Sequence, residues 1–326
     1  MSAMTYTVTE KQSGKRLDLF IAHYAAHISR NRIQSMVKDG HALVNGRMEK
    51  PSYKVKLGEV ITLDLPERTI HEVLPEAIPL NVMYEDSYIL VLNKPHGLVV
   101  HPAPGNYTGT LVNALLYHYG TLPLYNDGFH QSEREKTGIV HRLDKDTSGV
   151  IVVARTSEAL RSLSMQFKNR MVRKEYVAIV VGVIKKGSGT INTGIGRHVK
   201  DRKKISVLTH KAREAITDFV VRERYQQATL VGINIRTGRT HQIRVHMAHK
   251  GYPVLGDRIY GGARVMKLGA CAVTRQMLHA ESLSFFHPHT GHPMTFTAPL
   301  PVDMIEVINK LRKMKTGGSK SKSFTM

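Results

Sequence analysis

The run Gly138-Ile-Val-His-Arg-Leu-Asp-Lys-Asp-Thr-Ser-Gly149, followed by Val150-Ile-Val-Val-Ala154, is the most informative stretch of this chain. Its two ends are apolar and typical of buried strands, whereas its middle is a dense group of polar and charged side chains. Charges of both signs are seldom packed between two buried strands unless a site requires them there. Asp144 is therefore the first candidate for a chemical role.

The composition restricts the class of protein. The chain has 326 residues, enough for two domains, and a formal net charge of +21. This charge predicts a polyanionic partner, with nucleic acid as the first interpretation and an anionic membrane as the second. No segment reaches the roughly 18 apolar residues of a membrane span, and no secretory signal is visible. The single cysteine, Cys271, excludes an internal disulfide, so we expect a soluble cytoplasmic protein without a membrane partner.

Residues 15–70 are predicted to form a small domain after an N-terminal tail over 1–14. Apolar spacing, a cap at Ser29 and turn signals indicate helices near 17–24 and over 30–38, and strands near 42–46 and 58–65. The second helix is expected to turn Arg30, Arg32 and Lys38 outward. A solvated helix face is the ordinary interpretation of such cations, but the basic character of the whole chain favours a surface for phosphates.

A linker over 71–79 is predicted to lead to a large domain over 80–311. Strands are expected at 88–92, 151–154, 176–181 and 228–235, and helices at 110–119 and 157–167. Because strands outnumber helices and do not alternate regularly with them, we expect an α+β fold with a mixed, mainly antiparallel sheet. Residues 312–326 are basic and poor in apolar side chains, which predicts a disordered tail.

Several known chemistries can be tested against the segment around Asp144. The order His-Arg-Leu-Asp superficially resembles the catalytic loop of protein kinases, but the aspartate comes one position late and no glycine-rich phosphate loop is present. A magnesium ion between Asp144 and Asp146 is disfavoured by the neighbouring cations. His241, His246 and His249 suggest a zinc site, but the spacing of His241 and His246 is not a standard ligand spacing. We therefore expect no metal.

An aspartate among arginines is the feature that stays unexplained. An ionised carboxylate in a cleft must be compensated, because burial raises its pKa, and an arginine can do so while fixing the orientation of the carboxylate. Arg244 is the candidate partner. The pattern from Thr240 to His246 fits a capped helix or, by alternation, a strand. A purely structural ion pair between Asp144 and Arg244 is the alternative to an active site.

Further segments stand out for their order and spacing in the large domain. They are Asn93-Lys94-Pro95 through Val100-His101-Pro102, the run around Asp144, Lys174-Glu175-Tyr176, Thr237-Gly-Arg-Thr-His-Gln-Ile-Arg244-Val-His246, and Gly256-Asp257 with Tyr260-Gly-Gly262. Together they resemble the RluA-type pseudouridine synthases, most closely the RluD-like enzymes of large-subunit (23S) ribosomal RNA. The small domain is similar to the RNA-binding S4 domain through Lys15 to Asp18, Ser29 to Ile33 and Val44 to Gly46. The resemblance covers residues 15–311.

The resemblance implies an isomerase with the pseudouridine synthase fold, which converts specific uridines of RNA to pseudouridine without a cofactor. It implies that Asp144 is the nucleophile, that Arg244 is the paired cation and that Tyr176 stacks on the uracil and accepts the C5 proton. Arg142 is implied to occupy the stack vacated by the flipped base. The other residues implied to bind RNA are His141, Arg197 and Arg239 in the large domain, and Arg30, Arg32 and Lys38 in the small one.

Two other functions fit part of this pattern. A non-catalytic RNA-binding or ribosome-assembly factor would use the same basic surfaces, but it would not need the carboxylate of Asp144. A glycosidase or nuclease would use Asp144 and Asp146, and it would release free uracil or break strands. The expected partner is ribosomal RNA or its precursor particle, and the expected state is a monomer.

Overall fold

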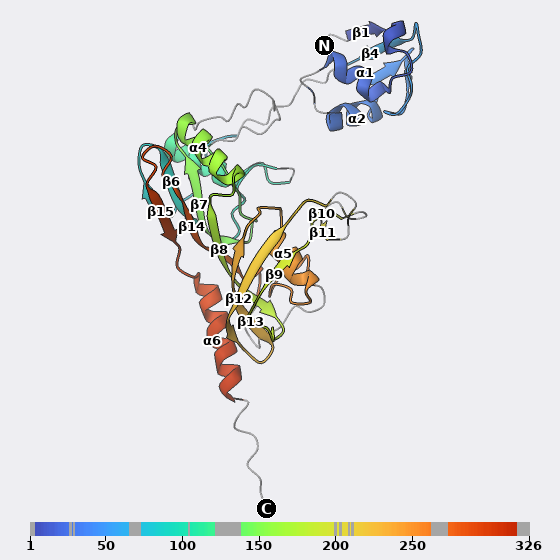
Figure 1. Ribbon diagram of the computed structural model, residues 1–326. Helices are drawn as coiled ribbons and strands as arrows, with labels where there is room; N and C mark the ends of the chain where they lie inside the picture. Colours follow the sequence, from blue (N-terminus) through green and yellow to red (C-terminus); the bar gives the residue numbers. More distant parts are fainter. Residues whose placement is uncertain are drawn as a thin grey trace, which may run out of the picture. The chain divides into compact units, whose positions relative to one another are not determined.

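The computed structural model describes residues 4–25, 28, 30–64, 73–103, 105–120, 138–198, 201, 204–207, 209, 212–261 and 273–317 (Figure 1). The chain divides into two compact units, of which the first lies within Met1–Glu72 and the second begins at Val73. Each unit has a hydrophobic core of its own. No helix among the described residues is long and apolar enough to cross a membrane.

The first unit combines a four-stranded antiparallel sheet with two α-helices. Its elements are β1 (Met4–Thr7), a 3-10 helix (Glu10–Gln12), α1 (Leu17–Tyr24), α2 (Arg30–Lys38), β2 (Ala42–Val44), β3 (Arg47–Met48) and β4 (Val60–Leu63), with the strand order β1-β4-β2-β3. The apolar faces of both helices and of β4 meet in one buried cluster around Leu17, Ile33 and Ile61. Asn45 and Gly46 have φ values of 48° and 76°, as a two-residue hairpin turn requires.

Strand β1 corrects the N-terminal tail predicted for residues 1–14. Met4 lies opposite Leu63 of β4 and Thr7 lies opposite Val60, so this segment is part of the sheet. Its side chains alternate between half-buried and exposed. A short edge strand with so little burial leaves almost no apolar pattern, and its partner strand is distant in the sequence. The strand was therefore not predictable from local pattern alone.

The second unit is built on a nine-stranded sheet in the order β5-β6-β7-β14-β8-β13-β12-β9, with β15 paired to β14. The strands are β5 (Val82–Glu85), β6 (Ile89–Lys94), β7 (Ser148–Ala154), β8 (Arg173–Val181), β9 (Ser188–Asn192), β12 (Ile216–Arg224), β13 (Ala228–Ile235), β14 (Leu278–Phe286) and β15 (Pro293–Thr297). A separate hairpin joins β10 (Gly196–Arg197) and β11 (Ile205–Ser206). Within the nine-stranded sheet the pair β7–β14 is parallel and the other pairs are antiparallel. The predicted mixed, mainly antiparallel α+β fold is confirmed.

Helices pack against both faces of this sheet. They are α3 (Leu111–Tyr119), α4 (Ser157–Lys168), α5 (Gln242–His249) and α6 (Val302–Gly317). Ile151 of β7 packs with α3, whereas its neighbour Val150 packs with α4. Tyr176 of β8 likewise packs with α5, and Val177 with α6. Consecutive side chains of a strand point to opposite faces, so a strand covered on both sides is buried throughout, as β7 is, and apolar over 150–154.

Two predicted boundaries of the large domain need correction. Residues 73–79, predicted as a linker, belong to the second unit: the Asn113 side chain donates to the Leu74 carbonyl at 2.7 Å, and the Glu76 amide donates to the Asn113 carbonyl at 3.0 Å. Helix α6 continues to Gly317, so the tail predicted from residue 312 is helical up to that point. Lysine, arginine and methionine are good helix formers, which explains the extension. Residues 318–326 lie outside the described part of the chain.

Candidate active site

Asp144 lies in a tight loop that leads into β7. The loop is closed by a hydrogen bond from the Thr147 amide to the Asp144 carbonyl at 3.1 Å. Gly149 follows with a φ of +117°, and a Cβ there would lie 2.1 Å from the carbonyl oxygen of Ala280 on β14. Only glycine fits where the loop enters the parallel strand pair. The Asp144 side chain is 18% exposed, so a ligand can reach a carboxylate that protein otherwise surrounds.

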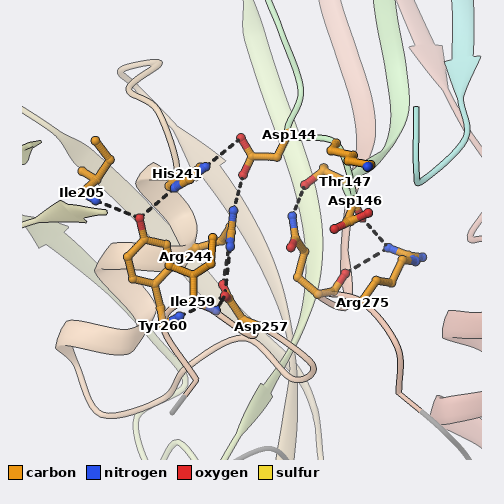
Figure 2. Close-up of polar contacts among 12 residues, drawn as sticks. Asp144, Asp146, Thr147, Ile205, His241, Arg244, Asp257, Ile259, Tyr260 and Arg275 are labelled. Carbon is orange, nitrogen blue, oxygen red and sulfur yellow. Dashed lines mark hydrogen bonds and ion pairs between the residues drawn. The ribbon is translucent and has the colours of Figure 1, made fainter. Parts of the chain in front are cut away.

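Arg244 forms an ion pair with Asp144 and is itself held from behind. Its Nη1 donates to Oδ2 of Asp144 at 2.9 Å, while Nε and Nη2 donate to the two carboxylate oxygens of Asp257 at 2.6 and 2.9 Å. Figure 2 shows the three side chains in this order. A bidentate pair fixes the plane of the guanidinium, so the Asp257 carboxylate directs the remaining nitrogen of Arg244 toward Asp144.

Asp257 is fully buried and stays ionised. Its Oδ1 also accepts hydrogen bonds from the amides of Ile259 and Tyr260, at 2.9 and 3.0 Å. Burial opposes ionisation, but the contacts with Arg244 and these amides outweigh it and lower the pKa of Asp257. Burial would lower the pKa of Arg244, but the two carboxylates raise it. The site therefore carries two carboxylates around one permanently charged guanidinium.

His241 is the second side chain that faces Asp144. It has left-handed backbone (φ 55°) at the start of α5, and its Nε2 lies 3.8 Å from Oδ1 of Asp144. The Tyr260 hydroxyl accepts from the Ile205 amide at 3.0 Å and lies 2.7 Å from His241 Nδ1 (Figure 2). When Tyr260 donates to Nδ1, the proton of the neutral imidazole is on Nε2, toward Asp144. Burial lowers the pKa of His241, which favours this neutral form.

Tyr176 projects from β8 into the same core cluster as Leu143, the neighbour of Asp144. Its side chain is almost fully buried. Burial, and then the negative charge of Asp144, raise the pKa of Tyr176. The phenol is therefore protonated at neutral pH, and its ring is rigidly packed.

Lys94 is a buried lysine in one of the segments that stand out in the sequence, where it was given no role. Its Nζ donates to the carbonyls of Pro95 and Leu98, both at 2.8 Å, and to the carbonyl of Lys145 at 3.1 Å. Burial lowers the pKa of Lys94 to about 7, although Asp144 acts in the opposite direction. Lys94 thus holds the carbonyl of the residue that follows Asp144.

Sequence reasoning predicted Asp144, Arg244 and Tyr176 and missed Asp257, His241 and Tyr260 as members of the site. Arg244 lies on a helix, which settles the open choice between helix and strand. His241 precedes that helix as its N-cap, in place of the predicted Thr240. All three missed residues lie in segments that stand out in the sequence: His241 in the run from Thr237 to His246, and Asp257 and Tyr260 in the run from Gly256 to Gly262. No pattern in one sequence pairs Asp257 with Arg244, because the contact depends on the tertiary fold.

The predicted RNA-binding residues of the second unit differ in their environment. Arg142 is exposed, and its charge contributes to the lowered pKa of His241. Arg197 is exposed on β10, and Arg239 donates from Nε to the Glu214 carbonyl at 3.3 Å. These side chains leave charge available at the surface.

His141 has contacts that indicate a structural role instead of the predicted RNA-binding one. Its Nε2 accepts a hydrogen bond from the Val152 amide at 3.1 Å, and its ring stacks on Phe167 at 4.7 Å between centroids. Burial, reinforced by the charge of Lys174, lowers the pKa of His141 to about 3. A neutral imidazole that accepts a backbone hydrogen bond has no positive charge to offer a phosphate.

In the first unit, Arg30 belongs to a network around the buried carboxylate of Asp18. Arg16 donates to Asp18 at 2.9 Å, Gln34 at 2.6 Å and Arg30 at 3.3 Å. Arg30 therefore has a structural partner as well as an exposed face. Lys38 is exposed at the end of α2, and the side chain of Arg32 lies outside the described part of the structure.

His246, one of the histidines considered for zinc, has both ring nitrogens next to oxygen atoms of the fold. The ring nitrogens of His246 lie 2.9 Å from the Thr217 hydroxyl and 2.9 Å from the Thr193 carbonyl. Within the described residues, no group of three or more His, Cys, Asp or Glu side chains is placed to hold a metal ion. Asp144 instead faces the cationic Arg244, an environment suited to a free carboxylate.

The chain is similar in sequence and structure to known proteins. The profile of the RNA pseudouridylate synthase family matches residues 88–249, and that of the S4 domain matches residues 15–61. An uncharacterized RNA pseudouridine synthase of Bacillus subtilis (strain 168), YlyB, is 44% identical, covering 96% of this chain and 99% of the relative. Ribosomal large subunit pseudouridine synthase D of Xanthomonas campestris pv. campestris is 42% identical, covering 94% and 92%. The solved structure of human RNA pseudouridylate synthase domain containing 1 is 26% identical with a TM-score of 0.55, covering 73% and 96%.

Proposed function

The chain belongs to the RNA pseudouridine synthase family, and we propose that it acts on large-subunit ribosomal RNA with Asp144 as its nucleophile. Enzymes of this family isomerise uridine in RNA: the bond from ribose C1′ to uracil N1 is exchanged for a bond from C1′ to C5. Relatives over nearly the whole chain that are named ribosomal large subunit pseudouridine synthase D support the choice of RNA.

The arrangement of Asp144, Arg244 and Asp257 is the observation that supports this mechanism best. Asp144 offers an accessible carboxylate oriented by a guanidinium, and Asp257 fixes that guanidinium from the opposite side. A carboxylate oriented in this way presents an oxygen to an electrophilic carbon and needs no general base to attack it. Its attack on C1′ breaks the bond to N1, and the attack of uracil C5 on C1′ then releases the carboxylate. The C5 proton passes to solvent and N1 gains one, so the reaction balances without a cofactor.

Tyr176 is proposed to stack on the uracil. Its raised pKa makes phenolate scarce at neutral pH, so it is a poor acceptor for the C5 proton. A buried and rigid aromatic ring is well suited to hold the detached base in place. We therefore propose the stacking role for Tyr176 rather than the proton-accepting role that the family resemblance implied.

Exposed cations, together with the half-buried Arg239, are proposed to bind the RNA backbone. Arg142, Arg197 and Arg239 are the candidates in the second unit, and Arg30 and Lys38 in the first. The net charge of +21 supports a phosphate-dominated affinity. Binding should therefore weaken steeply between about 50 and 200 mM salt, as for proteins that neutralise several phosphates. We further propose that the protein acts as a monomer in the cytoplasm, where ribosomes assemble.

Mapping pseudouridine in large-subunit RNA tests this function. RNA from cells that lack the protein should be missing pseudouridine at one or a few positions, and purified protein should restore them with no release of free uracil and no strand breaks. Free uracil or cleaved RNA would indicate a glycosidase or nuclease. Unchanged ribosomal RNA, with pseudouridine lost from transfer RNA, would contradict the proposed substrate and leave the reaction intact.

A further inference from the structure

Arg275 is a buried arginine that holds the far side of the Asp144 loop. Only 4% of the residue is exposed. Its Nε and Nη2 donate to the carboxylate of Asp303 in the first turn of α6, at 2.6 and 2.8 Å. Its Nη1 donates to the Asp146 carbonyl at 3.1 Å, a contact drawn in Figure 2, and to the carbonyls of Gln276 and Leu278. Asp146 is two residues from the proposed nucleophile.

The residues next to Arg275 connect the two loops that build the site. Gln276 donates from its side chain to the Thr147 hydroxyl at 3.2 Å, in the Asp144 loop. The Met277 amide donates to the Leu255 carbonyl at 2.8 Å, just before the turn that carries Asp257. At Gly256, a Cβ would lie 2.0 Å from the Arg275 carbonyl oxygen. The segment 275–277 is thus packed against both loops.

We propose that Arg275 is a positioning residue, which sets the Asp144 carboxylate in line with Arg244 by fixing the Asp146 carbonyl against the Asp257 turn and α6. The inference rests on the proposed role of Asp144. Burying an arginine costs free energy, and a neutral side chain of similar size would fill the same space without that cost. The charge and shape of the Arg275 guanidinium therefore need an explanation other than packing. Arginine alone combines a bidentate hold on Asp303 with a further nitrogen for the loop carbonyls.

In the proposed role, Arg275 controls the distance and angle between the Asp144 carboxylate and the Arg244 guanidinium. The ion pair between Asp144 and Arg244 spans residues that are far apart in the sequence, and its geometry depends on how the two loops are spaced. Without Arg275, the Asp146 carbonyl has no guanidinium to hold it, and the loop can shift. A displacement of about 1 Å at a reacting group can reduce a rate roughly a hundredfold. The RNA-binding surface is not altered by such a shift.

Substitutions of Arg275 and Asp303 test the role in the full-length protein. Arg275→Gln removes the charge, Arg275→Lys keeps it without the forked geometry, and Asp303→Asn weakens the hold of α6 on Arg275. Arg222→Lys is the matched control, since Arg222 makes a bidentate pair with Glu281 on the same sheet and lies outside the site. The readouts are the single-turnover rate of pseudouridine formation, the dissociation constant for RNA and the folded fraction from thermal unfolding.

The substitutions at the Arg275 site are expected to lower the reaction rate while leaving the affinity for RNA unchanged. Arg275→Gln should lower the single-turnover rate of folded protein by roughly ten- to a hundredfold, with RNA affinity within twofold of the wild type. The single-turnover rates of Arg275→Lys and Asp303→Asn should lie between those of Arg275→Gln and the wild type. The rate of Arg222→Lys should match that of the wild type. Equal rates after normalisation to the folded fraction would overturn the inference. If Arg275→Gln does not fold, Arg275→Lys and Asp303→Asn decide. An active Asp144→Asn protein would instead refute the proposed function.

Discussion

Arg244 donates a 2.9 Å hydrogen bond to Asp144 from a side chain that is only 4% exposed. A buried guanidinium must be neutralised, and Asp144 is only one of its two carboxylate partners. Asp257 is the other partner, and it forms a bidentate pair with Arg244. Because Asp257 holds Arg244 and Arg244 holds Asp144, the Asp144 carboxylate keeps a fixed orientation while it stays partly accessible.

Replacing Asp257 with asparagine should damage both stability and rate. The change leaves Arg244 with one carboxylate partner in a buried site, and breaking a buried ion pair costs about 3–5 kcal/mol. The free energy of unfolding, measured by chemical denaturation, should fall by about that amount. The rate of pseudouridine formation should also fall, because Arg244 loses its fixed plane. An unchanged rate in fully folded Asp257→Asn protein would show that Asp144 does not need this support.

Alanine at position 149 should destabilise the second unit. The φ of +117° is unfavourable for any side chain, and the new Cβ would lie 2.1 Å from a backbone oxygen that cannot move aside. The strain alone predicts a loss of at least about 2 kcal/mol. Gly187→Ala is the matched control, because that glycine has no atom within 4 Å of its hypothetical Cβ. Equal melting temperatures for the two variants would contradict the observed strand geometry.

Asp18 should make the first unit sensitive to acid. The Arg16 hydrogen bond is the main cause that lowers the pKa of Asp18 from 3.8 to about 2. Because the folded state binds the proton less tightly than the unfolded state, the contribution is complete above about pH 4 and is lost as the pH falls toward 2. Hydrogen exchange over residues 4–64 of the full chain should show this loss. In Asp18→Asn protein, protection should be lower at pH 7 and should vary less over that range.

His141 should destabilise the second unit when it is protonated. The pKa of His141 is about 3 in the folded protein against an ordinary value of 6.5, so the unfolded state binds the proton more readily. Stability should therefore decline as the pH falls from about 6.5 toward 3. His141→Gln keeps an acceptor for the Val152 amide and does not titrate, so its unfolding free energy should fall less over this range. An NMR titration that placed the His141 pKa near 6.5 would argue for the exposed, RNA-binding role instead.

The sequence predicted what depends on local pattern. The apolar run over 150–154 indicated a buried strand, and the polar run before it indicated the site. Both are properties of consecutive residues, and the structure shows the strand packed on both faces. Asp144 and Arg244 were paired on chemical grounds, because an arginine offsets a carboxylate in a cleft. The helical placement of Arg244 needed the structure, since residues 240–246 fit two periodicities.

What escaped prediction depends on contacts between distant segments. Asp257 and Arg275 are ordinary charged residues until the fold brings them to Arg244 and the Asp146 carbonyl. Strand β1 is recognisable only through its pairing with β4. His141 illustrates the opposite case: its place three residues before Asp144 suggested a role in RNA binding. Its ring is in fact occupied by the Val152 amide and Phe167.

Pseudouridine formation by Asp144→Asn protein, compared with Asp146→Asn protein, is the measurement that decides whether Asp144 is the nucleophile. Each full-length variant would be incubated with large-subunit RNA from cells that lack the protein, and pseudouridine would be quantified under single-turnover conditions. Asp144→Asn should bind the RNA and form no pseudouridine, because a neutral amide cannot attack C1′. Asp146→Asn removes an equal charge two residues away and should retain most of the activity. Full modification by Asp144→Asn would show that Asp144 is not the nucleophile.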